Sequence, residues 1–134
     1  MKMTMKSIFI LIGILIANNS FGQTQLDMNM QSQEKYSQAD EELNSVYKKI
    51  LVDYKNDAEF IKNLKLSQKI WIQFRDAEMK VKYPDREIGY YGSMHPSCWS
   101  LYMTELTTER TKCLKIWLTG IEEGDACGGS IKLK

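Results

Sequence analysis

The sequence has little of several residue types on which common catalytic and binding sites depend. His95 is the only histidine, and the three cysteines are dispersed, so the chain does not offer the four closely spaced ligands of a zinc site. A catalytic triad with a histidine base has only His95 as a candidate, and this residue lies in a loop-like stretch. Gly89 and Gly92 stand apart as turn residues, not as a phosphate-binding loop. We therefore predict no enzyme, no metal site and no cofactor.

An excess of charge of either sign is also missing. The chain has 18 basic and 17 acidic residues, which gives a formal net charge of +1. A chain with this charge lacks the excess of basic residues that attracts nucleic acid or an anionic membrane surface. We therefore expect no nucleic-acid partner.

Long apolar runs are confined to the N-terminus. Lys2 and Lys6 precede an uncharged apolar run over residues 8–17, which is too short for a membrane-spanning helix of about 20 residues. With small residues near its end, the segment 1–22 has the pattern of a secretory signal peptide. Its removal would leave no membrane anchor. We expect a periplasmic or secreted protein whose single domain is formed by residues 23–134.

The dominant pattern in the rest of the chain is helical periodicity. Apolar residues recur every three or four positions in three segments, which predicts helices at about 31–54, 57–82 and 97–119. Asn56 and Ser97 are the expected N-caps of the second and third helix. Because no stretch alternates like a strand, we predict an all-α fold, a small antiparallel three-helix bundle. The expected inward face of the first helix is Tyr36, Ala39, Leu43, Val46, Ile50 and Tyr54.

The inward stripes of the second and third helices contain polar residues. An unpaired buried guanidinium is costly, so we expect Arg75 to be largely buried and bonded to an acidic or amide group of another helix. Arg75 and Arg110 could instead bind an acidic ligand, but we favour internal pairing, with Asp40, Glu41, Asn44 or Glu109 as acceptors. The expected stripes are Ile61, Leu64, Gln68, Trp71, Arg75 and Glu78 on the second helix and Trp99, Tyr102, Leu106, Arg110, Cys113 and Trp117 on the third.

A long loop over residues 83–96 joins the second and third helices and contains two prolines, two glycines and three tyrosines. Loops of this length inside a compact domain are uncommon and are often functional. A tyrosine- and glycine-rich protrusion on a rigid bundle can enter a cleft at low entropic cost. Alternatively, the tyrosines pack over the end of the bundle. The candidate partner-binding residues are Asp85, Arg86, Tyr90, Tyr91, Ser93 and His95.

Motifs in the three helices resemble the family of the lysozyme inhibitor LprI N-terminal domain. They are LNSVY at 43–47, SQKIWIQFRDAE at 67–78 and LTTERTKCL at 106–114, and the resemblance covers about residues 36–118. It implies a small exported helical protein that is not an enzyme and binds a protein partner, which in some members is lysozyme. The alternative is an envelope structural or assembly factor that acts through an exposed helix face. The motif residues are Leu43, Asn44, Tyr47, Gln68, Trp71, Arg75, Asp76, Thr107, Arg110, Thr111 and Leu114.

The cysteines depart from the common pattern of this family, which has one cysteine in the first helix and another near Met103. Members with a tail like EGDACGGS tend to have cysteines at the positions of Cys98 and Cys127. The resemblance therefore implies a Cys98–Cys127 disulfide, with Cys113 as a buried free thiol. The distance that the tail must span favours Cys113 as the partner of Cys127, because the tail would only have to fold back along about two turns of the third helix.

Overall fold

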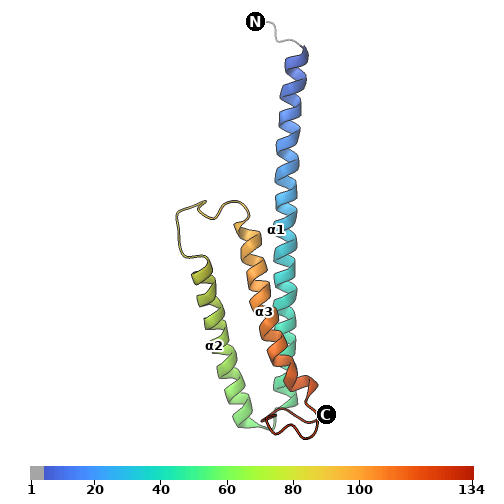
Figure 1. Ribbon diagram of the computed structural model, residues 1–134, viewed down its shortest axis with the longest axis vertical. Helices are drawn as coiled ribbons and strands as arrows, with labels where there is room; N and C mark the ends of the chain where they lie inside the picture. The colour runs from blue at the N-terminus through green and yellow to red at the C-terminus, as the bar shows by residue number, and fades with distance from the viewer. Residues whose placement is uncertain (1–4) are drawn as a thin grey trace.

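A computed structural model describes the backbone of residues 5–134 and the side chains of residues 24–134. It contains three helices, α1 (Met5–Asp53), α2 (Ala58–Lys82) and α3 (His95–Thr119). A short turn joins α1 to α2, a long loop joins α2 to α3, and α2 runs opposite to the other two (Figure 1). The described residues contain no strand, and the predicted all-α helical bundle is confirmed.

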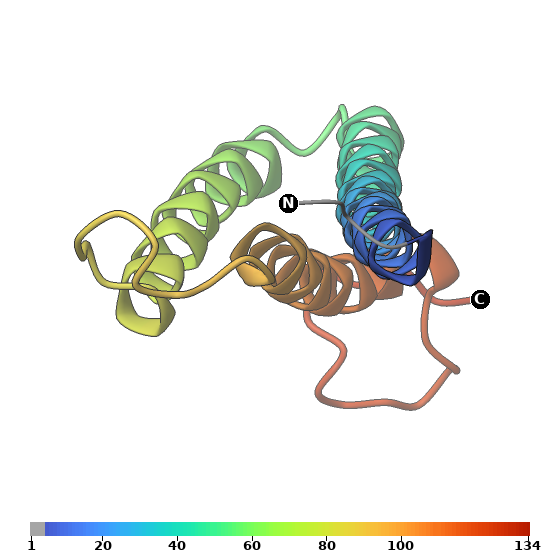
Figure 2. The same ribbon diagram turned by 90° about the horizontal axis from the view of Figure 1, so that it is seen from above.

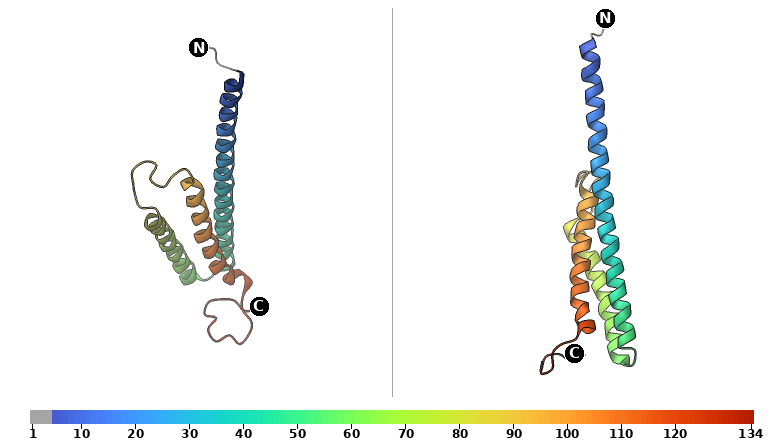
Figure 3. Two further views of the ribbon diagram at one scale, coloured as in Figure 1. Left: turned by 45° about the horizontal axis from the view of Figure 1, so that its top comes forward. Right: turned by 90° about the vertical axis from the view of Figure 1, so that its right-hand side faces the viewer.

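The helix α1 extends further toward the N-terminus than the predicted start at residue 31, and it projects beyond the start of α3 (Figure 3). Residues 24–30, which precede the predicted start, are helical. They lie beside the start of α3, where Ser97 Oγ donates a hydrogen bond to Asn29 Oδ1. This contact joins residues that are far apart in the sequence, so the periodicity of α1 alone could not reveal it.

The signal peptide predicted over residues 1–22 lies outside the part of the chain whose side chains are described. It stays a prediction. Within the described residues, the structure contains no helix that is both long and apolar enough to cross a membrane.

The core lies mainly between α1 and α3, which pack side by side (Figure 2). The predicted inward face of α1 is confirmed, because Ala39, Leu43, Val46, Ile50 and Tyr54 are buried. The predicted face of α3 is wrong, since the helix is rotated relative to it. The buried residues of α3 are Ser97, Ser100, Met103, Thr107, Thr111 and Leu114.

Hydroxyl residues explain this rotation of α3. Thr111 Oγ1 donates to Thr107 O at 3.0 Å, and Thr104 Oγ1 donates to Ser100 O at 2.8 Å. The buried Thr111 therefore needs no partner from another helix. Ser97 bonds to Asn29 of α1 instead, and the buried Thr107 Oγ1 has no hydrogen-bond partner among the described residues. The small side chains of the hydroxyl residues let α3 lie close to α1, while the larger Trp99, Tyr102 and Leu106 of the predicted stripe lie half-buried at the side.

Both predicted helix caps are wrong, by one residue for α2 and by three residues for α3. Asp57, and not Asn56, caps α2, because its Oδ1 accepts a hydrogen bond from Phe60 N at 2.9 Å. The helix α3 begins at His95 with Pro96 in its first turn, where the missing N–H of proline leaves no intrahelical bond unmade. Ser97 therefore lies inside the helix.

The helix α2 packs less closely than the other two. The short turn sends it antiparallel to α1, but it diverges with distance from the turn, and α3 is the main neighbour of α1 (Figures 1 and 3). Near the turn, Tyr54 and Phe60 stack with ring centroids 4.2 Å apart. Of the predicted inward stripe of α2, Leu64 and Gln68 are buried, and the remaining members are half-buried.

The tail after α3 is fastened to the bundle. Ile121 N donates to Lys132 O at 3.1 Å and Lys134 N donates to Ile121 O at 2.9 Å, which closes a loop. Lys132 N donates to Tyr54 Oη at 3.2 Å, so the loop is tied to the end of α1. Gly120 turns the chain at φ +73°, where a Cβ would lie 2.8 Å from Lys132 O. Only glycine fits this turn without strain.

Candidate functional site

The motif residues of α2 and α3 form a polar layer around Trp71. Arg110 Nε donates to Gln68 Oε1 at 3.1 Å and its Nη2 donates to Ser67 Oγ at 3.0 Å, which joins α3 to α2. The guanidinium carbons of Arg75 and Arg110 lie 5.4 Å and 6.0 Å from the centroid of the Trp71 ring. The predicted internal pairing of Arg110 is confirmed, although none of the four predicted acceptors is used.

Arg75 differs from the prediction in its partner. Its side chain is 15% exposed, so the predicted burial is confirmed. Its Nε and Nη2 donate to Asp76 Oδ1 at 3.0 Å and 2.8 Å, so the acceptor is the next residue of the same helix. Adjacent residues can pair because the guanidinium folds back along its own helix.

The environment of Tyr36 on α1 is linked to this pair. Burial raises the pKa of Tyr36 from its usual value, Arg75 opposes the shift, and Asp40 and Asp76 add to it.

The other motif residues are mainly structural. Leu43, Thr107, Thr111 and Leu114 are buried between α1 and α3. Asn44 is exposed, and its Nδ2 donates to the main-chain and side-chain oxygens of Asp40 on the preceding turn. Tyr47 is half-buried beside it.

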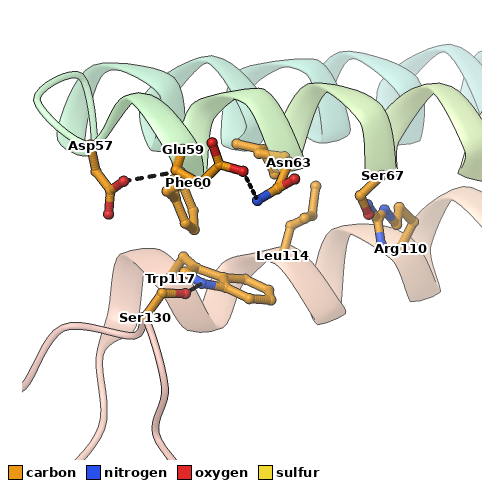
Figure 4. Close-up of a pocket in the computed structure, with 10 residues that line it drawn as sticks. Asp57, Glu59, Phe60, Asn63, Ser67, Arg110, Leu114, Trp117 and Ser130 are labelled. Carbon is orange, nitrogen blue, oxygen red and sulfur yellow. Dashed lines mark hydrogen bonds between the residues drawn. The ribbon is translucent and has the colours of Figure 1, made fainter.

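A groove of about 460 Å³ lies between α2 and α3 (Figure 4). Its lining is largely apolar, with Asn63 between the two ends. Arg110 and Ser67 lie at one end and Asp57 at the other. This groove was not predicted from the sequence. The pattern that could have indicated it is the pair of large aromatics, Phe60 and Trp117, at ends of helices that the fold brings together. The apolar lining residues are Phe60, Leu64, Leu114 and Trp117.

Desolvation lowers the pKa of Arg110 from its usual value. Its two hydrogen-bond acceptors, Gln68 and Ser67, are both neutral. Among the described residues, no carboxylate forms an ion pair with this guanidinium. Arg110 is therefore a half-buried cation at the end of an apolar groove.

The base of the long loop is closed by aromatic packing. Tyr91 Oη donates to Pro84 O at 2.6 Å. The Tyr91 ring stacks on His95 with centroids 4.9 Å apart, and Tyr83 meets both rings edge-on. For Tyr83 and Tyr91, packing over the end of the bundle is therefore the correct alternative.

The tip of the loop is open to solvent. Ile88 is fully exposed and Tyr90 is 61% exposed, with the Arg86 guanidinium 5.8 Å from the Tyr90 ring centroid. Gly89 turns the chain at φ +84° between them. Of the predicted loop residues, Asp85, Arg86, Tyr90 and Ser93 are exposed, whereas Tyr91 and His95 belong to the base. Ile88 was missed, although it is the only branched aliphatic residue of the loop.

The outer face of α2 carries an apolar stripe. Leu66, Ile70, Phe74 and Val81 are each more than half exposed. Their spacings of four, four and seven residues place them on one side of the helix, away from Gln68. Phe74 therefore faces solvent.

All three cysteines are free and exposed. The Cys98–Cys127 disulfide implied by the resemblance is not formed in the structure, because Cys98 lies in the first turn of α3 and Cys127 lies in the tail beyond its last turn. The tail is tied to Tyr54 at the far end of the bundle instead of running back along α3. Cys113, expected to be buried, lies on the solvent side of α3 because that helix is rotated.

The fold and the polar layer define a small helical protein in which tryptophan, arginine and glutamine side chains join two helices. No cluster of three or more potential metal ligands occurs among the described residues. A family model described as lysozyme inhibitor LprI matches residues 17–114, and the chain belongs to this family. The match includes every motif residue and stops before Trp117 and the tail. No curated protein and no solved structure matches the chain.

Proposed function

We propose that this chain is an exported, non-enzymatic protein of the periplasm or the extracellular space that binds a protein partner, and that the partner is a lysozyme. Membership of the lysozyme inhibitor LprI family supports the inhibitor role. The observation that carries the proposal is the exposed tip of the long loop, where Ile88 and Tyr90 lie in solvent above a closed aromatic base.

A fixed base and an exposed tip suit a loop that enters a cleft. When a partner removes exposed apolar and aromatic side chains from water, the free energy of the system falls, and this favours binding. The Tyr91 hydrogen bond to Pro84 and the stacking on His95 already order the base, so less conformational entropy is lost on binding. Asp85, Arg86 and Glu87 beside the tip sum to a charge of only −1, so we expect contact at the tip to determine affinity more than electrostatic steering.

The apolar stripe of α2 favours the second candidate, an envelope structural or assembly factor. Leu66, Ile70 and Phe74 form a continuous apolar row that no described element covers. Helices with such a row commonly lie in a groove of a partner. This function would use a different surface from the loop, so the two candidates can be separated by substitution.

The test is inhibition of c-type lysozymes by the purified protein and by two double variants. An Ile88→Ser, Tyr90→Ala variant removes the loop tip, and an Ile70→Ser, Phe74→Ser variant removes the centre of the stripe. Both pairs are exposed, so both variants should keep the helical circular dichroism signal of the parent.

We expect the loop variant to lose inhibition and the stripe variant to retain it. Inhibition lost only in the stripe variant would move the inhibitory surface to α2 and contradict the loop proposal. No inhibition of any lysozyme by the parent protein would contradict the inhibitor role and favour the assembly factor.

A further inference from the structure

We propose that the groove between α2 and α3 binds a small amphipathic carboxylate, such as a medium-chain fatty acid, with its carboxylate on Arg110 and its apolar chain along Leu64, Leu114 and Trp117. This ligand site is separate from the loop tip and does not depend on the lysozyme proposal.

The charge of Arg110 is not matched by an anion among the described residues. A guanidinium has five N–H donors, and Arg110 uses two of them on the neutral acceptors Gln68 and Ser67. Arg75 on the neighbouring helix, by contrast, already has the carboxylate of Asp76. Burial without an anion disfavours the charged form of Arg110, and a bound carboxylate would reverse that effect. Carboxylates are the ligands that the guanidinium fork matches best.

The shape and lining of the groove suit an apolar chain. Its volume of about 460 Å³ is within the range of small-molecule sites, and its lining is mainly aromatic and aliphatic, with the amide of Asn63 between the two ends (Figure 4). Ser67 and Phe60 are separated by about 10 Å along α2 at 1.5 Å per residue. An apolar chain of that length could leave Arg110 and reach Phe60 and Trp117 without leaving the groove.

The charges at the two ends set the orientation of the ligand. Asp57 and Glu59 lie at the end remote from Arg110, and both are already used within the protein. Asp57 accepts a hydrogen bond from Phe60 N, and Glu59 accepts from Lys62 and Asn63. Their negative charges disfavour an anion at that end, so the groove suits a monocarboxylate with one charged end.

The test is isothermal titration of the purified protein with octanoate and with 1-octanol, which has the same chain length and no charge. We expect octanoate to bind more tightly than octanol. Arg110→Gln should weaken octanoate binding by about tenfold or more, the effect of losing a hydrogen bond to a charged group, and should leave octanol binding unchanged. Arg75→Gln is the matched control and should change neither affinity.

Nuclear magnetic resonance supplies a second readout that does not require a variant. Trp117 Nε1 donates to Ser130 Oγ at 3.1 Å on the rim of the groove, so its indole N–H resonance should shift when octanoate is added. The indole resonance of Trp99, which packs against Tyr36 on the other side of α3, should stay in place.

Several outcomes would overturn the proposal. Equal binding of octanoate and octanol would show that Arg110 does not select the carboxylate. Binding of octanoate that is unchanged in Arg110→Gln, or a shift of Trp99 without a shift of Trp117, would place the ligand elsewhere. If octanoate produced neither a heat of binding nor a resonance shift, the groove would not bind this ligand. If Arg110→Gln fails to fold, the octanoate–octanol comparison and the Trp117 resonance still decide.

Discussion

The two faces of α3 differ in how they hold the neighbouring helix. Toward α1, the helix presents Thr107, Thr111 and Leu114, all nearly inaccessible to solvent. Toward α2, it presents Arg110, which reaches across to Gln68 and leaves an open groove beside it. Small side chains thus allow close packing on one face, while long polar side chains hold the other helix at a distance.

This difference implies an uneven distribution of stability. Apolar area removed from water stabilises the α1–α3 contact, and the gain is about 25 cal/mol per Å². Hydrogen bonds between neutral and charged side chains hold much of the α2–α3 contact, and their net contribution is smaller because water competes for the same groups. We therefore expect α2 to separate from the bundle more readily than α1 separates from α3.

The largest expected effect comes from breaking the α1–α3 contact. Leu114→Ala removes a side chain that is 1% exposed and should lower the free energy of unfolding by about 2–5 kcal/mol, because a cavity remains in the core. Chemical denaturation measures the change. Ile116→Ala on the exposed side of the same helix is the control and should have a much smaller effect. Similar losses in both variants would contradict the assignment of the core to this face.

An intermediate effect is expected at the α2–α3 contact. Arg110→Ala leaves the buried amide of Gln68 without its partner and should cost about 1–3 kcal/mol. Hydrogen exchange should show faster exchange of α2 amides, with smaller changes in α1. Uniform acceleration in all three helices would mean that α2 is not a separate cooperative unit.

Helical periodicity was sufficient to predict the three helices, the inward faces of α1 and α2, and the loop, because these depend on local spacing. The face of α3 was not predictable in the same way. Its most apolar stripe includes Trp99 and Leu106, but Ser100 and Thr107 are buried because small side chains let α1 approach. The groove beside Arg110 was missed for a similar reason, since it depends on how far apart two helices lie. The exposed stripe of α2 could have been found from its spacing alone.

Substitution of Arg75 should lower the stability less than its place in an apolar stripe of the sequence suggests. Its ion-pair partner, Asp76, is 56% exposed and lies on the same helix, so the pair holds no other helix in place. Because Asp76 is exposed, the pair itself should contribute no more than about 1 kcal/mol, and Arg75→Ala should cost this amount together with the lost contact between the largely buried guanidinium and Trp71. Thermal unfolding beside Arg110→Ala gives the comparison. A larger loss for Arg75 than for Arg110 would reverse the roles assigned to the two arginines.

The smallest effect is one of pH and concerns Tyr36, which lies on α1 near Arg75. Its pKa is raised from 10.0, chiefly because burial disfavours the phenolate. The unfolded chain therefore loses this proton at a lower pH than the folded chain, so the contribution of Tyr36 to stability is full below about pH 10 and declines as pH rises further. Tyr36→Phe removes the titration. Its unfolding midpoint should match that of the parent near pH 7 and exceed it near pH 11, where Tyr83, whose pKa is also raised, titrates equally in both proteins. Parallel pH profiles would show that Tyr36 is no more shielded from water in the folded chain than in the unfolded one.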